Sequence, residues 1–184
     1  GVILPNSLLS DVPSQMDGYR PENFHEDYDG VIPARRALIR SLNVPMVHLL
    51  RAYGLEKFHY ELRKLGLSHL HRPAAHYGLT LILGGAEASL WDLAGAYAGM
   101  GRTLLHQYEH DGRYDPADFH PLNYLHGQAV ERTPRSKLRA EAPHISAAAA
   151  WLTFAAMQEV ERPDSEGNWE QFRSNRRIAW KTGT

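Results

Sequence analysis

Apolar positions recur at helical spacing through the first third of the chain, and proline and glycine interrupt the pattern. This spacing predicts a short helix over residues 34–40, a second over 45–53 and a third over 55–65. Glycine directly follows the second and third segments, where helices commonly end. The apolar side of the third helix would carry Leu55, Phe58, Leu62 and Leu65.

Pro45 separates the first two predicted helices. Proline cannot donate to the helical hydrogen-bond ladder, and it disfavours helical geometry at the residue before it, Val44. The residues Ser41-Leu42-Asn43 are therefore expected on an elbow between two helices, not on a helix face.

Ser89, with Asp92 three positions later, resembles a capping box and predicts the start of another helix. Its apolar stripe would be Leu90, Leu93, Ala94 and Tyr97. An alanine-rich helix is predicted over 146–160. Trp91 and Trp151, one in each helix, are expected in the core.

These patterns predict an α+β fold that is mostly helical and forms one partial domain over residues 1–184. It would comprise an extended lead-in (1–32), a helical subdomain (33–160, loop-like over 101–143) and a strand (176–184). A single strand cannot form a sheet. Its partners are therefore expected outside the chain, which indicates a fragment.

Composition narrows the function classes. Lys and Arg number 20 against 21 Asp and Glu, so nothing favours binding to nucleic acid. The absence of cysteine excludes disulfides and thiol catalysis. Two histidine pairs could bind a metal, His69 with His71 and His106 with His110. Solvated surface histidines are the favoured interpretation of both pairs. Neither a metal nor a cofactor is therefore predicted. No signal peptide and no apolar run of membrane-spanning length is evident.

The Ser41-Leu42-Asn43 elbow offers chemistry suited to acyl transfer through a serine. The Ser41 hydroxyl can relay a proton because it both donates and accepts hydrogen bonds. The Asn43 amide NH2 can hold a substrate carbonyl while its oxygen holds a lysine. With Lys181, whose charge would suit an anionic substrate, these are the candidate catalytic residues.

The second motif is Lys181-Thr182-Gly183-Thr184. The hydroxyls of Thr182 and Thr184 can bind a carboxylate, and Gly183 lets a substrate approach the strand closely. These three residues are the candidate substrate-binding set.

Each motif alone has an ordinary structural explanation, as a helix cap or a strand-to-turn transition. Their order is more specific, because S-x-N and K-T-G are two of the three motifs of serine penicillin-binding proteins and β-lactamases. The third, S-x-x-K, carries the nucleophile, and no serine of this chain has a lysine three positions later.

Longer stretches resemble the bifunctional (class A) penicillin-binding proteins. Residues 33–50 resemble their S-x-N helix pair, and residues 77–97 resemble their next signature. Residues 19–24, 162–164 and 178–184 are similar to the 1C subgroup.

The resemblance implies the transpeptidase (β-lactamase-like) domain of a peptidoglycan synthase on the periplasmic side of the bacterial inner membrane. Ser41, Asn43, Lys181, Thr182 and Thr184 match the family's active-site positions. The implied partners are peptidoglycan stem peptides, β-lactam antibiotics and the remainder of the domain, with a membrane anchor and a glycosyltransferase domain upstream. The fragment alone, lacking the nucleophile, is expected to be inactive.

Two other functions use or retain the same motifs. One is a β-lactamase or β-lactam sensor. The other is a non-catalytic interaction module.

Overall fold

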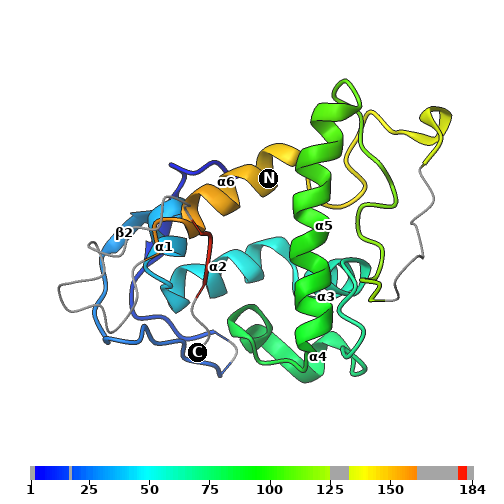
Figure 1. The fold of residues 1–184 in the computed structure, drawn as a ribbon. Coiled ribbons are helices and arrows are strands. Elements are labelled where there is room, and N and C mark those ends of the chain that lie inside the picture. The colour runs from blue at the N-terminus through cyan, green and yellow to red at the C-terminus, as the bar shows by residue number, and fades with distance from the viewer. Residues whose placement is uncertain (1–2, 17, 125–132, 161–177, 182–184) are drawn as a thin grey trace. The chain divides into compact units, whose positions relative to one another are not determined.

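The computed structural model describes residues 3–16, 18–124, 133–160 and 178–181. Two short strands and a larger set of helices make up this part of the chain, which confirms the mostly helical α+β prediction (Figure 1). Contacts group the chain into two compact units. Unit 1 contains residues 1–55, 77–85 and 152–184, and unit 2 contains residues 56–76 and 86–151.

Unit 1 begins with a small antiparallel sheet. Strand β1 (Leu8–Asp11) pairs with β2 (Gly30–Pro33), Leu8 opposite Pro33 and Asp11 opposite Gly30. Every second residue of β1 is buried. The lead-in predicted over 1–32 thus contains a sheet, which the sequence pattern did not reveal because strands of four residues carry too little alternation.

Helices α1 (Ala34–Ile39) and α2 (Asn43–Tyr53) follow the sheet. The hydrophobic core of unit 1 joins sheet and helices through Leu9, Ile32, Ala37 and Leu42. Helix α2 also packs on β1 and on the 3-10 helix η1 (Gly78–Leu83). It begins two residues earlier than predicted, because proline is tolerated in a first turn whose N–H groups have no helical partner.

Unit 2 contains most of α3 (Leu55–Lys64) and α4 (Ala74–Tyr77), with α5 (Leu90–Glu109) and the short 3-10 helix η2 (Arg135–Lys137). The predicted cap of α5 is confirmed, since the Ser89 hydroxyl accepts a hydrogen bond from the Asp92 N–H at 3.0 Å.

Helix α5 extends further than the sequence pattern indicated. The prediction of a loop from residue 101 is wrong for 101–109, which are helical. Glycine weakens a helix in isolation, but here tertiary packing compensates. Gly99 is buried, and the ring of Phe119 occupies the space that a side chain there would fill.

Helix α6 (Ala147–Met157) precedes the C-terminal segment. Residues 178–181 are the described part of the strand predicted over 176–184, and they form no strand. The Trp180 N–H donates instead to the Met157 carbonyl at 3.2 Å. Backbone N–H and C=O groups that do not pair with a neighbouring strand must find other hydrogen-bond partners.

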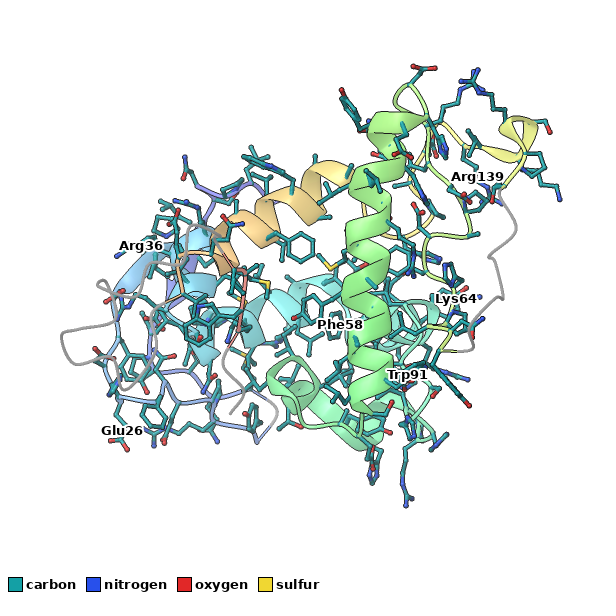
Figure 2. All side chains as sticks on the ribbon, viewed as in Figure 1. Glu26, Arg36, Phe58, Lys64, Trp91 and Arg139 are labelled. Atoms are coloured by element: carbon teal, nitrogen blue, oxygen red, sulfur yellow. The ribbon has the colours of Figure 1, made fainter. Side chains whose placement is uncertain are left out.

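The two tryptophans expected in the core are exposed. Trp91 retains 46% of its surface and Trp151 retains 61%, so that prediction is wrong. Trp91 lies in the first turn of α5 (Figure 2). Its ring is edge-on to that of Tyr124, with the centroids 5.9 Å apart. None of the described helices is both long and apolar enough to cross a membrane.

Candidate active site

The elbow that carries Ser41 and Asn43 is a tight helix C-terminus. Ser41 has a φ of 55°, in the left-handed region, and its N–H donates to the Leu38 carbonyl at 3.1 Å. The N–H of Leu42 donates to the Ala37 carbonyl at 3.0 Å. These two bonds form a Schellman motif, with serine at the position that glycine usually occupies.

The motif fixes the Ser41 backbone at some cost. A left-handed conformation at a non-glycine residue costs about 1–2 kcal/mol. Burial of the next side chain, Leu42, in the core beside Ala37 offsets that cost. Such retained strain is common at functional sites.

Asn43 is the first residue of α2, and a distant side chain holds it. The residue before it, Leu42, occupies the N-cap position and provides no side-chain cap. Asn23 supplies the missing acceptor, because its Oδ1 receives the N–H groups of Asn43 at 3.0 Å and Val44 at 3.2 Å. The Asn43 amide donates in turn to the Glu22 carbonyl at 2.9 Å.

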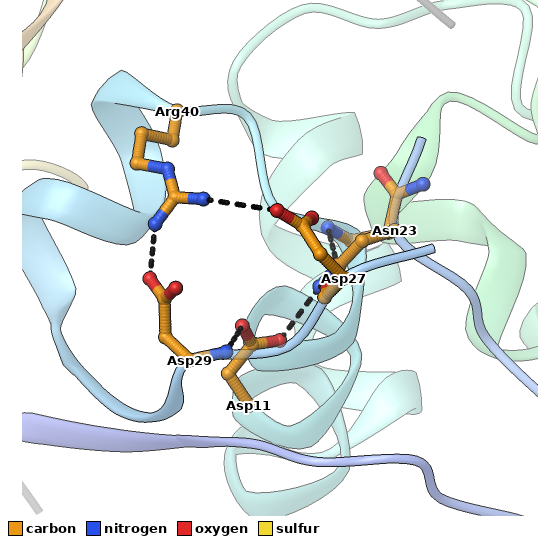
Figure 3. Close-up of polar contacts among 6 residues, drawn as sticks. Asp11, Asn23, Asp27, Asp29 and Arg40 are labelled. Atoms are coloured by element: carbon orange, nitrogen blue, oxygen red, sulfur yellow. Dashed lines mark hydrogen bonds and ion pairs between the residues drawn. The ribbon is translucent and has the colours of Figure 1, made fainter. Parts of the chain in front are cut away.

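The other end of the Asn23 side chain is also bound (Figure 3). Its amide nitrogen donates to Asp11 Oδ1 at 2.8 Å and to the Asp27 carbonyl at 2.9 Å. Asp11 and Asn23 are 1% and 2% exposed. Asp11 Oδ2 accepts the Asp29 N–H at 2.9 Å, so this buried carboxylate is hydrogen-bonded through both oxygens.

Arg40, the last residue before the elbow, closes the network from the surface. Its guanidinium pairs with Asp29 and lies 3.9 Å from Asp27, between the two carboxylates in Figure 3. The residues around the elbow thereby tie it to the loop over 23–29 and to the sheet.

Lys181, the other candidate catalytic residue, belongs to the same compact unit as the elbow. Its side chain keeps an exposed surface, yet desolvation of the ammonium group lowers the pKa of Lys181 below its ordinary value. Thr182, Gly183 and Thr184 lie outside the described residues.

The elbow presents two polar side chains from adjacent elements. Ser41 and Asn43 are both half-buried. The Asn43 Oδ1 accepts no hydrogen bond from the described residues, so it can still receive a donor. A hydroxyl can pass a proton, and an amide oxygen can orient a cationic or amide group.

The sequence predicted Ser41 and Asn43 as site residues but gave no indication of Asn23 and Asp11, which hold the elbow. No local spacing links Asn23 to a helix that begins twenty residues later. Asparagine in a proline-containing segment is ordinarily a turn residue. Only the folded chain shows that its side chain caps α2.

Comparisons with known proteins agree with the motifs. No protein family model matches the chain. It is 38% identical, over all 184 residues, to penicillin-binding protein 1C of Escherichia coli strain K12, of which it covers 21%. It is also 29% identical to penicillin-binding protein 1B of Vibrio cholerae, over 97% of this chain and 22% of that protein. The chain thus spans about a fifth of the length of these curated relatives.

The fold is similar to that of a solved structure. A crystal structure of penicillin-binding protein 1A from Haemophilus influenzae matches with a TM-score of 0.53 and 19% identity. The match covers 91% of this chain and 28% of the other. At this identity the likeness concerns the fold alone.

Proposed function

Because the chain resembles the transpeptidase region of class A penicillin-binding proteins, we propose that it is part of a serine D,D-transpeptidase domain. The observation that carries the proposal is the 38% identity to penicillin-binding protein 1C along the whole chain. That stretch includes an S-x-N motif held on a rigid elbow. The substrate would be a peptidoglycan stem peptide ending in D-Ala-D-Ala.

In the proposed reaction a serine Oγ attacks the carbonyl carbon of the D-Ala-D-Ala amide. The amide C–N bond breaks, D-Ala leaves with a proton, and an acyl-serine ester remains. A stem-peptide amine then attacks the ester and restores the serine hydroxyl. The nucleophile would come from an S-x-x-K segment, which these 184 residues do not contain.

The residues of this chain would guide the proton and hold the substrate. Ser41 would relay the proton to the leaving amine, because a hydroxyl both donates and accepts hydrogen bonds. Asn43 would receive a lysine or substrate N–H at its open Oδ1. Lys181 would add positive charge beside the substrate carboxylate. Thr182, Gly183 and Thr184 would bind that carboxylate and let the substrate approach closely.

The wider assignment follows from the same resemblance. The domain would act on the periplasmic side of the inner membrane, in a protein that also polymerises glycan strands. β-Lactam antibiotics would be attacked by the same serine, because they resemble the D-Ala-D-Ala terminus.

Covalent labelling by a fluorescent penicillin tests the proposal. We expect no adduct on the 184 residues alone, and labelling once a segment with S-x-x-K completes the domain. In the completed domain, Asn43→Ala should slow acylation at least about tenfold, since a preorganised hydrogen bond contributes about 1.5–4 kcal/mol to the barrier. The exposed substitution Asn6→Ala is the matched control and should leave the rate unchanged.

Three outcomes would favour a different function. Stoichiometric labelling of a serine within these 184 residues would place the nucleophile in this chain. Rapid hydrolysis of the acylated drug would identify a β-lactamase. A completed domain that is never acylated would support the non-catalytic interaction module.

A further inference from the structure

A histidine and two aspartates converge near the C-terminal end of α5 in unit 2. One ligand atom from each of His106, Asp115 and Asp118 lies within 4.8 Å of the other two. His106 is on the last turn of the helix, and the aspartates lie on the loop that follows it. Imidazole nitrogen and carboxylate oxygen are common ligands of zinc.

The two carboxylates are buried yet incompletely paired. Asp115 is 6% exposed and Asp118 is 2% exposed. Both bonds to the Asp115 carboxylate, from the Ala117 N–H and the Thr133 hydroxyl, go to Oδ1 and come from neutral groups. Asp118 Oδ1 lies 2.6 Å from His106 Nδ1. The Oδ2 atoms of both aspartates accept no hydrogen bond from the described residues.

The local charge is also unbalanced. Two carboxylates this close repel each other in a desolvated site. Arg102 is the nearby cation, but its guanidinium donates to the backbone carbonyls of Asp118 (2.6 Å) and His120 (3.1 Å). It therefore contributes a positive field at Asp118 without occupying either open oxygen.

The scaffold of the cluster is already rigid. The same two bonds from Arg102 fix the loop backbone against α5. Tyr114, next to Asp115, exchanges backbone hydrogen bonds of 2.8 and 2.9 Å with Arg139. The site therefore needs little ordering of its backbone before it can bind.

We propose that His106, Asp115 and Asp118 form a binding site for a divalent metal ion, with zinc as its best-matched occupant. One imidazole and two carboxylates supply three protein ligands and leave a fourth position for water. Zinc–ligand bonds of about 2.0–2.2 Å need ligand atoms roughly 3.4 Å apart. The His106–Asp118 contact of 2.6 Å therefore opens when the ion binds. The ion takes the place of the proton between His106 and Asp118, which is released to solvent, and its two positive charges neutralise the two carboxylates.

The stacked ring of His110 fits this account. It lies 5.3 Å from the His106 ring at 22°, one helical turn later. Its Nδ1 is shielded from solvent and has no hydrogen-bond partner among the described residues. A second imidazole with an unbonded, solvent-shielded nitrogen therefore lies beside the cluster.

Zinc titration of the chelator-treated protein tests the site. We expect one saturable site per chain by calorimetry and a higher thermal midpoint with zinc. Asp118→Asn and His106→Gln should each weaken binding at least about tenfold. Asp111→Asn, at a side chain that is 87% exposed, is the matched control and should bind zinc normally.

A second measurement on the unsubstituted protein guards against variants that fail to fold. Paramagnetic cobalt(II), added below one equivalent, should broaden the amide signals of Ala117 and Asp118 before others. Absence of saturable binding, or first broadening at other histidines, would show that the cluster is only an ion pair. Unchanged binding in folded Asp118→Asn and His106→Gln would overturn the proposal equally.

Discussion

Asn23 is the residue on which the geometry of the Ser41–Asn43 elbow most depends. Helix α2 begins after a leucine, which offers no acceptor to the first N–H groups. The Asn23 amide satisfies two of them while holding Asp11 and the Asp27 carbonyl with its NH2. We therefore regard it as a positioning residue for the candidate site, acting through Asn43.

Removing this amide should destabilise the protein more than a typical polar truncation. Asn23→Ala removes the acceptor of the Asn43 and Val44 N–H groups and the donor to Oδ1 of the buried Asp11 carboxylate. We expect the free energy of unfolding to fall by about 2–4 kcal/mol, measured by denaturant titration. Asn6→Ala, the same change at an exposed position, should alter it by less than about 0.5 kcal/mol.

The near-isosteric substitution Asn23→Asp distinguishes the contribution of the amide oxygen, which caps α2, from that of the amide NH2, which binds Asp11. It keeps an acceptor for α2 but points an oxygen at Asp11 Oδ1, where the amide donated at 2.8 Å. It should be at least as destabilising as Asn23→Ala near neutral pH. Wild-type stability for Asn23→Asp would show that the contact with Asp11 contributes nothing.

At the scale of secondary-structure elements, capping interactions decide where the helices begin and end. Helix α5 carries its own cap in Ser89, whereas α2 borrows one from Asn23. The first was predictable because the spacing of three residues is local, and the second was not.

The N-terminus of α5 should make stability depend on acid pH. Hydrogen bonds lower the pKa of Asp92 from 3.8 to about 2, although burial opposes the shift. The largest contribution comes from His69, and Ser68 and Ser89 add to it. Because the folded-state pKa lies below the unfolded value, this stabilisation is present above about pH 4 and is lost as pH falls through 2.

Asp92→Asn should reduce the dependence of the thermal midpoint on pH between about 4 and 2. Asp111→Asn, at an exposed carboxylate, should leave the dependence unchanged. An identical pH profile for Asp92→Asn and wild type would contradict the assignment.

Two glycines of α5 should respond oppositely to the same substitution. A Cβ at Gly99 would lie 2.7 Å from Phe119 Cε1, whereas one at Gly101 meets nothing within 4 Å. Gly99→Ala should destabilise by about 1–3 kcal/mol through overpacking. Gly101→Ala should stabilise by up to about 1 kcal/mol through helix propensity. Thermal unfolding measures both, and equal effects would mean that Phe119 does not fill the space beside Gly99.

At the scale of the whole molecule, each compact unit is assembled from separated stretches of chain. Unit 1 combines three segments and unit 2 combines two. Within unit 1, an ion pair between Arg35 and Glu159 and the hydrogen bond from Trp180 to Met157 join residues far apart in sequence. Neither unit could be outlined from the sequence, because periodicity reports one element at a time.

The sequence by itself determined the elements whose signals are local. The cap at Ser89 and the helix end at Gly54 followed from serine and glycine chemistry within a few residues. An elbow near Ser41 was also predicted, although a Schellman motif forms it and Pro45 lies inside α2. The order of two short motifs indicated serine penicillin-binding proteins or β-lactamases, and longer stretches such as residues 33–50 indicated the class A resemblance. The tertiary structure alone decided what depends on distant partners: the β1–β2 pairing, the cap from Asn23 and the meeting of His106 with two aspartates. Burial and hydrogen bonding between remote residues leave no period in the sequence, so only the folded chain reveals them.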